Sequence, residues 1–183
     1  YVEAIKFQKL AVEKAPFEIP FYLNLSETLI QINRLEESLS TLYFAKVLSL
    51  KDKSIDYKLA KIHTKLKNYL KADLIYQELI KEDNVASEII YDYCDNLIRS
   101  SKAKEAILFL EKYELKNPKD EQVKVIIGFA YYNIKQYETA KNILLEVTKS
   151  NNFNEQALTI LGDCYEQLGD LDQAKNYYNQ TLK

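Results

Sequence analysis

Glycine and proline are scarce in this sequence, with three residues of each among 183. Folds built from many strands need many turns, and turns depend heavily on these two residues. No region shows the sustained alternation of apolar and polar residues that is typical of half-buried strands. These absences favour an all-α fold.

Histidine and cysteine are scarce as well: His63 is the only histidine, and the two cysteines are Cys94 and Cys164. Metal-binding clusters need several such ligands at short spacing. The sequence also lacks a glycine-rich phosphate loop and a nucleophile elbow. We therefore expect no metal, no cofactor and no catalytic site in this chain, and we expect His63 to be a core residue rather than a general base.

Neither sign of charge dominates, since 25 basic and 27 acidic residues give a net charge of −2. A general nucleic-acid-binding protein would carry a basic stripe that neutralises phosphates. We therefore expect no nucleic-acid partner. No uncharged apolar run approaches the roughly 20 residues of a membrane-spanning helix, so we also expect no membrane insertion by this chain.

A period of 34 residues runs through the whole chain. The segment Leu161-Gly162-Asp163-Cys164-Tyr165 has its counterpart one period earlier in Ile127-Gly128-Phe129-Ala130-Tyr131. Position 1 of the repeat is set at Ile19, Lys53, Ser87, Glu121 and Glu155. Position 8 is then always small: Ser26, Ala60, Cys94, Gly128 and Gly162. Position 20 is small too: Ala4, Ser38, Ala72, Ala106, Ala140 and Ala174. Antiparallel helices need such residues where their backbones approach most closely, because larger ones would overpack the contact.

Large residues also keep their places. Position 24 is large in every copy except the first: Gln8, Leu42, Tyr76, Leu110, Leu144 and Tyr178. These side chains are expected to fill the space around the small contacts.

This pattern resembles the tetratricopeptide repeat family, whose unit is a helix-turn-helix of the same length. The resemblance implies an all-α, right-handed superhelical solenoid of antiparallel helix pairs. We expect a single array over residues 1–183, with a half repeat at 1–18, full repeats at 19–52, 53–86, 87–120 and 121–154, and a truncated repeat at 155–183. We also expect the chain to be a fragment of a longer array. The family's tryptophan at position 4 is absent, because the sequence contains no Trp.

The same register predicts where the helices lie. First helices are expected near residues 20–32, 53–66, 87–100, 121–134 and 155–168. Second helices are expected near 34–48, 68–82, 102–116, 136–150 and 171–183, preceded by a lone second helix from Tyr1 to Lys14. Cys94 and Cys164 fall two repeats apart, which exceeds the ~7 Å that a disulfide allows between Cα atoms. We therefore expect two buried free thiols, which favour a reducing compartment such as the cytoplasm.

By resemblance to the family, positions 2, 5, 9, 12 and 13 of the first helices line a concave groove. The candidate partner-binding residues in this groove are Tyr57, Lys61, Lys65, Tyr91, Asp95, Arg99, Val125, Phe129 and Tyr132. Phe129 and Tyr132 are the strongest candidates, because exposed aromatic side chains anchor partners effectively. The alternative is that both side chains lean into the helix stack or contact the first helix of the neighbouring repeat. For the charged residues, the alternative is an ordinary solvated face.

The family subgroup that grips the C-terminal carboxylates of chaperones uses Lys at position 5 and Asn at position 9. Neither residue occupies those positions here, so we do not expect that function. The sequence instead predicts a non-catalytic scaffold that binds a protein or a peptide segment. Two alternatives remain open: self-association into a homo-oligomer, and a substrate-docking arm of an enzyme whose catalytic domain lies outside the chain.

Overall fold

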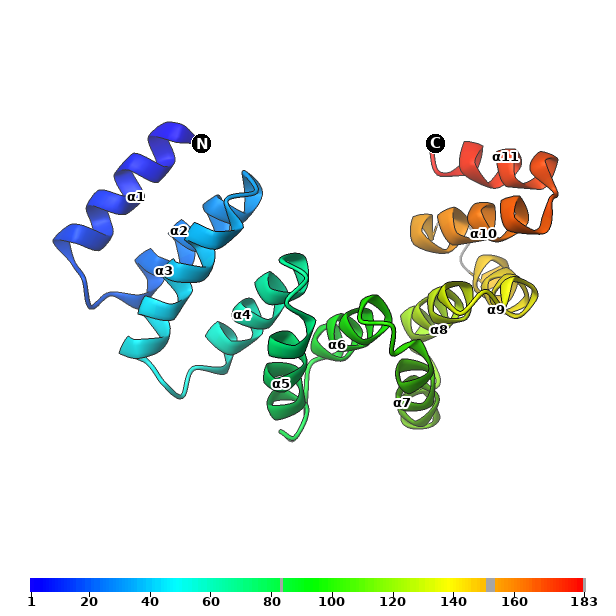
Figure 1. Ribbon diagram of the computed structural model, residues 1–183, viewed down its shortest axis with the longest axis horizontal. Helices are drawn as coiled ribbons and strands as arrows, with labels where there is room; N and C mark the ends of the chain where they lie inside the picture. Colours follow the sequence, from blue (N-terminus) through cyan, green and yellow to red (C-terminus); the bar gives the residue numbers. More distant parts are fainter. Residues whose placement is uncertain (83, 151–153, 183) are drawn as a thin grey trace. The chain divides into compact units, whose positions relative to one another are not determined.

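The computed structural model describes residues 1–82, 84–150 and 154–182. These residues form eleven α-helices and no strand (Figure 1). The first helices of the repeats are α2 (Ile19–Gln31), α4 (Lys53–Lys65), α6 (Ser87–Arg99), α8 (Glu121–Asn133) and α10 (Glu155–Leu168). The second helices are α1 (Val2–Lys14), α3 (Leu35–Leu48), α5 (Tyr69–Leu79), α7 (Ala103–Lys116), α9 (Tyr137–Ser150) and α11 (Leu171–Gln180).

The helices begin within one residue of the expected starts. The all-α repeat fold predicted from the sequence is therefore confirmed. Helix α5 differs at its other end, because it ends at Leu79 rather than near residue 82. None of the helices within the described ranges combines the length and the apolar character that crossing a membrane requires.

The chain divides into two compact units, Tyr1–Tyr93 and Cys94–Lys183, which we call unit 1 and unit 2. The single array over 1–183 stays a prediction. Within unit 1, α2 packs against α3, and α4 packs against α5. Within unit 2, α8 packs against α9, and α10 packs against both α9 and α11 (Figure 1).

The small residues at positions 8 and 20 lie where they were expected, at buried contacts between the two helices of a repeat. In unit 1 the Oγ atoms of Ser26 and Ser38 lie 2.8 Å apart, and both residues are fully buried. Ala60 and Ala72 take the same places in the next repeat and are also fully buried. The close approach of the helices therefore explains why these positions stay small along the chain.

The turn inside each repeat contains one residue in the left-handed backbone conformation. Its φ is 59° at Asn33 and Lys67, 66° at Ser101, 64° at Lys135 and 86° at Gly169. The amide of the following residue donates to a carbonyl in the last turn of the first helix at 2.8 to 3.0 Å. This is the Schellman arrangement that ends helices. Position 15 of the repeat is thus conformationally fixed, although only one of its five residues is glycine.

His63 and both cysteines are buried. The hydroxyl of Tyr43 lies 2.9 Å from Nε2 of His63. The thiols of Cys94 and Cys164 are free, as expected, and burial raises the pKa of each to about 12. These three residues belong to the interior and offer no exposed reactive group.

Candidate functional site

The two aromatic residues singled out on α8 are partly buried. Phe129 and Tyr132 pack against the core of unit 2, which includes Leu144 of α9 and Ile160 of α10. The ring of Tyr132 also lies 5.4 Å from the ring of Tyr137. Both side chains are therefore partly buried in the helix stack, which was the alternative interpretation of the sequence. Each keeps exposed area that a partner can contact.

Val125 is fully buried, so its expected exposure is wrong. It lies in the same core cluster as Ala157 and Ile160 of α10. The same cluster contains residues of α9, so neighbouring helices on both sides of the cluster bury the side chain. Val125 is therefore a core residue and not a residue that a partner can reach.

Two carboxylates of α10 lie near the hydroxyl of Tyr132. The charges of Asp163 and Glu166 help to raise the pKa of the Tyr132 hydroxyl, after the larger effect of its burial. We call the surface formed by Phe129, Tyr132, Asp163 and Glu166 the α8–α10 face. It combines exposed aromatic area with negative charge.

The hydroxyl of Tyr178 on α11 lies within hydrogen-bond distance of both carboxylates. Its Oη lies 2.8 Å from Oδ1 of Asp163 and 2.9 Å from Oε2 of Glu166. Burial and these two acceptors raise the pKa of Tyr178. Because the hydroxyl is neutral, it orients the carboxylates without cancelling their charge.

Within the described part of the chain, no Lys or Arg forms an ion pair with Asp163 or Glu166. Helix α10 itself contains three acidic residues and no basic one, in the sequence EQALTILGDCYEQL. The α8–α10 face is therefore negatively charged and has no counter-ion among the residues that the structure describes.

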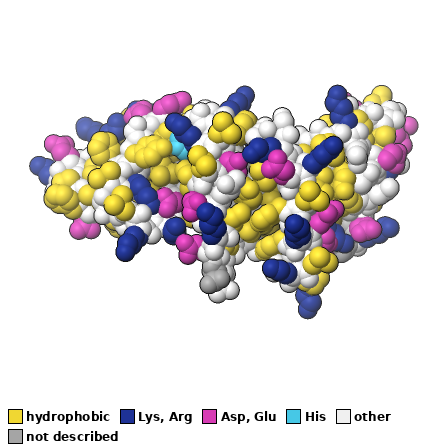
Figure 2. Space-filling model, turned by 60° about the horizontal axis from the view of Figure 1, so that its bottom comes forward, with side chains coloured by type: hydrophobic (Ala, Val, Ile, Leu, Met, Phe, Trp, Pro, Cys, Tyr) yellow, Lys and Arg dark blue, Asp and Glu magenta, His cyan; other side chains and the backbone are white. Residues whose placement is uncertain are grey.

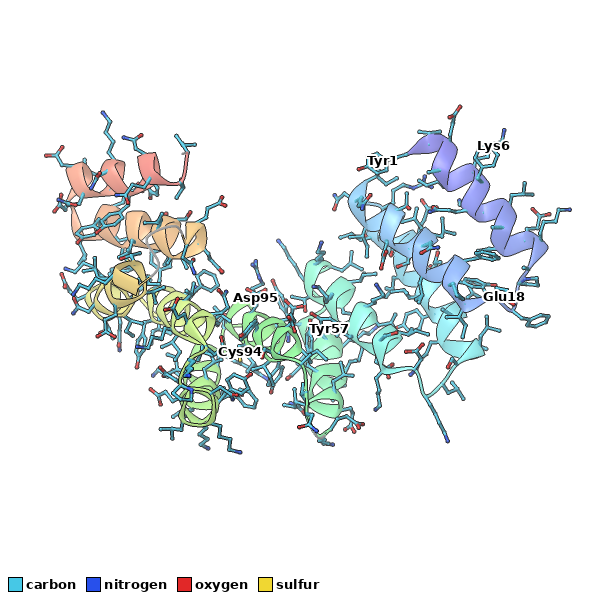
Figure 3. The ribbon with its side chains drawn as sticks, turned by 180° about the vertical axis from the view of Figure 1, so that it is seen from behind. Tyr1, Lys6, Glu18, Tyr57, Cys94 and Asp95 are labelled. Atoms are coloured by element: carbon cyan, nitrogen blue, oxygen red, sulfur yellow. The ribbon has the colours of Figure 1, made fainter. Side chains whose placement is uncertain are left out.

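The candidates on α4 and α6 in unit 1 form a different arrangement. Tyr57 is labelled in Figure 3. Its hydroxyl donates to Oδ2 of Asp92 at 2.5 Å, and Nζ of Lys61 lies 3.0 Å from the same oxygen. Nζ of Lys61 also lies 5.1 Å from the centre of the Tyr57 ring. Burial and the Asp92 carboxylate raise the pKa of Tyr57. The carboxylate in this network is neutralised from within the chain.

Other charges of the predicted groove are paired as well. Nε of Arg99 lies 2.6 Å from Oδ2 of Asp95 on the same helix, and Lys58 pairs with Glu27. Lys65 is exposed and Tyr91 is partly buried. These pairings favour the solvated-face interpretation for most of the charged candidates.

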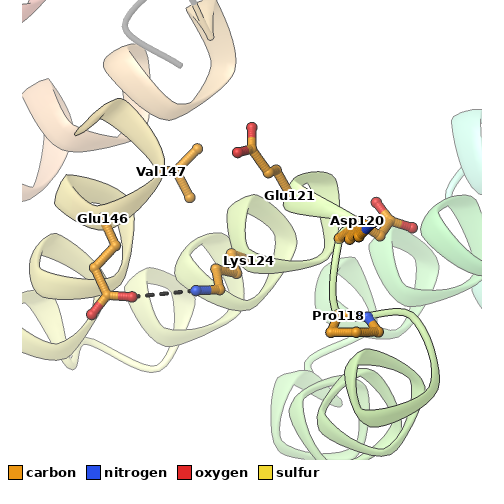
Figure 4. Close-up of a pocket in the computed structure, with 7 residues that line it drawn as sticks. Pro118, Asp120, Glu121, Lys124, Glu146 and Val147 are labelled. Carbon is orange, nitrogen blue, oxygen red and sulfur yellow. Dashed lines mark hydrogen bonds and ion pairs between the residues drawn. The ribbon is translucent and has the colours of Figure 1, made fainter. Parts of the chain in front are cut away.

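A hollow of about 390 Å³ lies in unit 2 near the start of α8 (Figure 4). It is lined by Pro118, Lys119, Asp120, Glu121, Lys124, Glu146 and Val147. An ion pair of 3.3 Å joins Lys124 and Glu146 at its edge. The hollow shares no residue with the α8–α10 face, and the sequence did not point to it.

Comparison with known proteins agrees with this architecture. Residues 155–183 match the tetratricopeptide repeat family. No curated protein matches the sequence.

Several solved structures share the fold. A tetratricopeptide repeat protein from Parabacteroides merdae is 19% identical with a TM-score of 0.83, over 99% of this chain and 72% of that chain. TTC0263, a thermophilic TPR protein from Thermus thermophilus, is 18% identical with a TM-score of 0.76, over 90% of each chain. YrrB, a TPR protein with an unusual peptide-binding site, is 17% identical with a TM-score of 0.61, over 96% of this chain and 90% of that chain.

At these identities the likeness concerns the fold. The chain is thus an all-α repeat protein of the tetratricopeptide repeat fold, and its residues 155–183 match that family in sequence.

Proposed function

We propose that this chain is a non-catalytic interaction module that binds a segment of a partner protein against the first helices of its repeats. The principal contact is the α8–α10 face of unit 2. The observation that carries the proposal is that Phe129 and Tyr132 keep exposed area beside two carboxylates that have no counter-ion among the described residues.

Aromatic side chains suit this role physically. A tyrosine or phenylalanine offers a large contact area and loses little conformational entropy when a partner binds. The packing of Phe129 and Tyr132 against the core of unit 2 restrains both rings before binding. Restraint of this kind lowers the entropic cost of forming a complex. The fold of YrrB, whose structure has a peptide-binding site, supports the same type of function.

The remaining predicted groove residues enter the proposal as secondary contacts: Tyr57, Lys61, Lys65, Tyr91, Asp95 and Arg99. Lys61 and Arg99 already pair with acidic side chains. A partner that binds them must therefore replace an existing interaction, which reduces the net gain.

The test is affinity capture from a lysate of the source cells. Thr159 is exposed on α10, four residues before Asp163, and Thr159→Arg places a large cation on the face without removing any core contact. We expect this variant and the double variant Phe129→Ala, Tyr132→Ala to lose a partner that the parent chain retains. Circular dichroism checks that the helices persist.

The matched control is the double variant Phe7→Ala, Phe44→Ala, which removes two exposed aromatic rings from the second helices α1 and α3. Retention of the partner by this control locates the contact on the first helices. Equal capture by all variants would refute the proposal.

Self-association is the second candidate function. Phe7 on α1 is 68% exposed, and Phe44 and Val47 on α3 are 65% and 74% exposed. Figure 2 shows hydrophobic side chains that reach the surface between charged ones on the face in view. Exposed apolar area of this kind promotes association. Light scattering at two protein concentrations tests it: a mass that rises with concentration and returns to the monomer value in Phe44→Glu supports self-association.

A further inference from the structure

We infer that the segment bound at the α8–α10 face is basic: an extended stretch of a partner protein that carries Lys or Arg next to an apolar residue. This inference rests on the proposed function and names the chemistry of the partner.

The carboxylates of the face have unused capacity to accept hydrogen bonds. The Tyr178 hydroxyl lies within reach of both, at 2.8 Å and 2.9 Å, but it carries a single proton. Each carboxylate offers about four acceptor positions. Asp163 is partly buried and Glu166 is exposed, so both remain accessible to a donor from outside. A lysine or guanidinium group supplies several donors together with the charge that the pair lacks.

The position of these acids in α10 also disfavours a purely structural role. Glu166 lies in the last turn of a helix that ends at Leu168, where the helix dipole is negative. An acidic side chain there is unfavourable, and the neighbouring Asp163 adds repulsion between like charges. No basic residue in the last turn offsets this. A bound cation would remove the cost.

Unit 1 contains a similar group of side chains together with its cation. There, Tyr57 of α4 lies against Asp92 of α6, and Lys61 contacts both the carboxylate and the tyrosine ring. Lys61 occupies position 9 of its repeat, and the residue at position 9 of α8 is Phe129. The counterparts of Tyr57 and Asp92 in unit 2 are Val125 and Ile160, so the tyrosine and the carboxylates of unit 2 stand at other repeat positions, and Phe129 stands where unit 1 has Lys61. A cation from a partner would supply to these carboxylates the charge that Lys61 supplies to Asp92.

The aromatic residues favour the same occupant. A cation over the face of a tyrosine or phenylalanine ring is attracted by the ring's electrons. The remaining exposed area of Phe129 suits an apolar neighbour of that cation. An acidic or phosphorylated segment would instead meet two carboxylates of its own sign and be repelled.

The test begins with a random-peptide phage library selected on the intact chain, followed by fluorescence polarisation with synthetic peptides. The peptides share one apolar sequence and carry Lys and Arg, Gln, or Glu at the same positions. We expect the selection to enrich basic residues next to apolar ones, and the basic peptide to bind best. Binding should weaken as salt concentration rises.

Variants decide whether Asp163 and Glu166 are responsible. We expect Asp163→Asn with Glu166→Gln to weaken binding of the basic peptide about fivefold to tenfold, since each partly exposed ion pair contributes up to ~1 kcal/mol. The matched control is Glu155→Gln with Asp172→Asn, which removes two exposed acids from the first turns of α10 and α11. Glu166→Lys should shift the preference toward the acidic peptide, which a merely structural role of Glu166 would not do.

Each outcome is decisive. Enriched peptides that depend on Phe129 and Tyr132 but show no basic preference would overturn this inference and leave the interaction function standing. Unchanged binding in the Asp163→Asn, Glu166→Gln variant would do the same. A selection that enriches no peptide at all would overturn the proposed function as well.

Discussion

The ring of Tyr178 on α11 occupies the space that a side chain at Gly162 on α10 would need. A Cβ at Gly162 would lie 2.3 Å from Cε1 of Tyr178, which is far shorter than a van der Waals contact. The same ring ends in the hydroxyl that binds Asp163 and Glu166. The absence of a side chain at Gly162 therefore lets Tyr178 reach the acidic pair of the α8–α10 face.

Gly162→Ala should destabilise the chain by about 1–3 kcal/mol, because the ring or the helix must move to relieve the overlap. The loss is expected although alanine favours helices over glycine by about 1 kcal/mol. Urea unfolding followed by circular dichroism measures it. In a Tyr178→Leu background the same substitution should cost less, and equal costs in both backgrounds would show that the ring is not the obstacle.

Lys135 provides a test of the left-handed position in the turns, since its φ is 64°. Lys135→Gly should stabilise the chain by roughly 0.5 kcal/mol, because the strain of a side chain in this region exceeds the added entropy of the unfolded chain. Gly169→Ala should destabilise the chain by roughly 1 kcal/mol. No atom lies within 4 Å of a Cβ at this position, so the positive φ is the cause of the loss. Thermal melting measures both. The same sign for the two substitutions would contradict the explanation.

The repeat register was predictable because small residues recur at positions 8 and 20 wherever two helices touch. The left-handed turn position was not, because Asn33, Lys67, Ser101 and Lys135 stand where composition would suggest glycine. Only Gly169 carries that signal. Backbone conformation there is dictated by the helix pair and overrides the preference of the residue.

The sequence indicated on which side of α8 the candidate face lies, but not which residues on that side are buried. Helical spacing placed Val125, Phe129 and Tyr132 on one side of α8, yet it could not show that the neighbouring helices bury Val125 completely. The hydroxyl of Tyr178 on α11 lies within hydrogen-bond distance of Asp163 and Glu166 on α10. The repeat pattern does not predict this contact. Such contacts depend on packing between helices, which spacing within one helix does not contain.

Cys94 and Cys164 should be unreactive in the folded chain. Both are fully buried, and burial raises the pKa of each thiol to about 12, so very little thiolate exists near neutral pH. A chromogenic disulfide reagent such as Ellman's reagent should label neither thiol in the native protein and both after denaturation. Rapid labelling of the native chain at a rate independent of denaturant would contradict the buried placement.

His63 should make stability depend on pH. Burial, with a smaller contribution from the charge of Lys71, holds its pKa in the folded chain below the ordinary value. Its Nδ1 has no hydrogen-bond partner among the described residues, while Nε2 lies 2.9 Å from the Tyr43 hydroxyl. As pH falls below ~6.5, the unfolded chain takes up a proton that the folded chain resists, so the free energy of unfolding falls.

His63→Leu isolates this effect, because leucine stands at the same repeat position in Leu29 and Leu97. The unfolding free energy of the parent chain should fall by up to about 1.4 kcal/mol more per pH unit than that of the variant, between the ordinary histidine pKa and the lower folded one. Urea unfolding at a series of pH values measures the difference. Parallel curves for the two proteins would mean that His63 keeps its ordinary pKa in the fold, and that the pH dependence comes from the carboxylates alone.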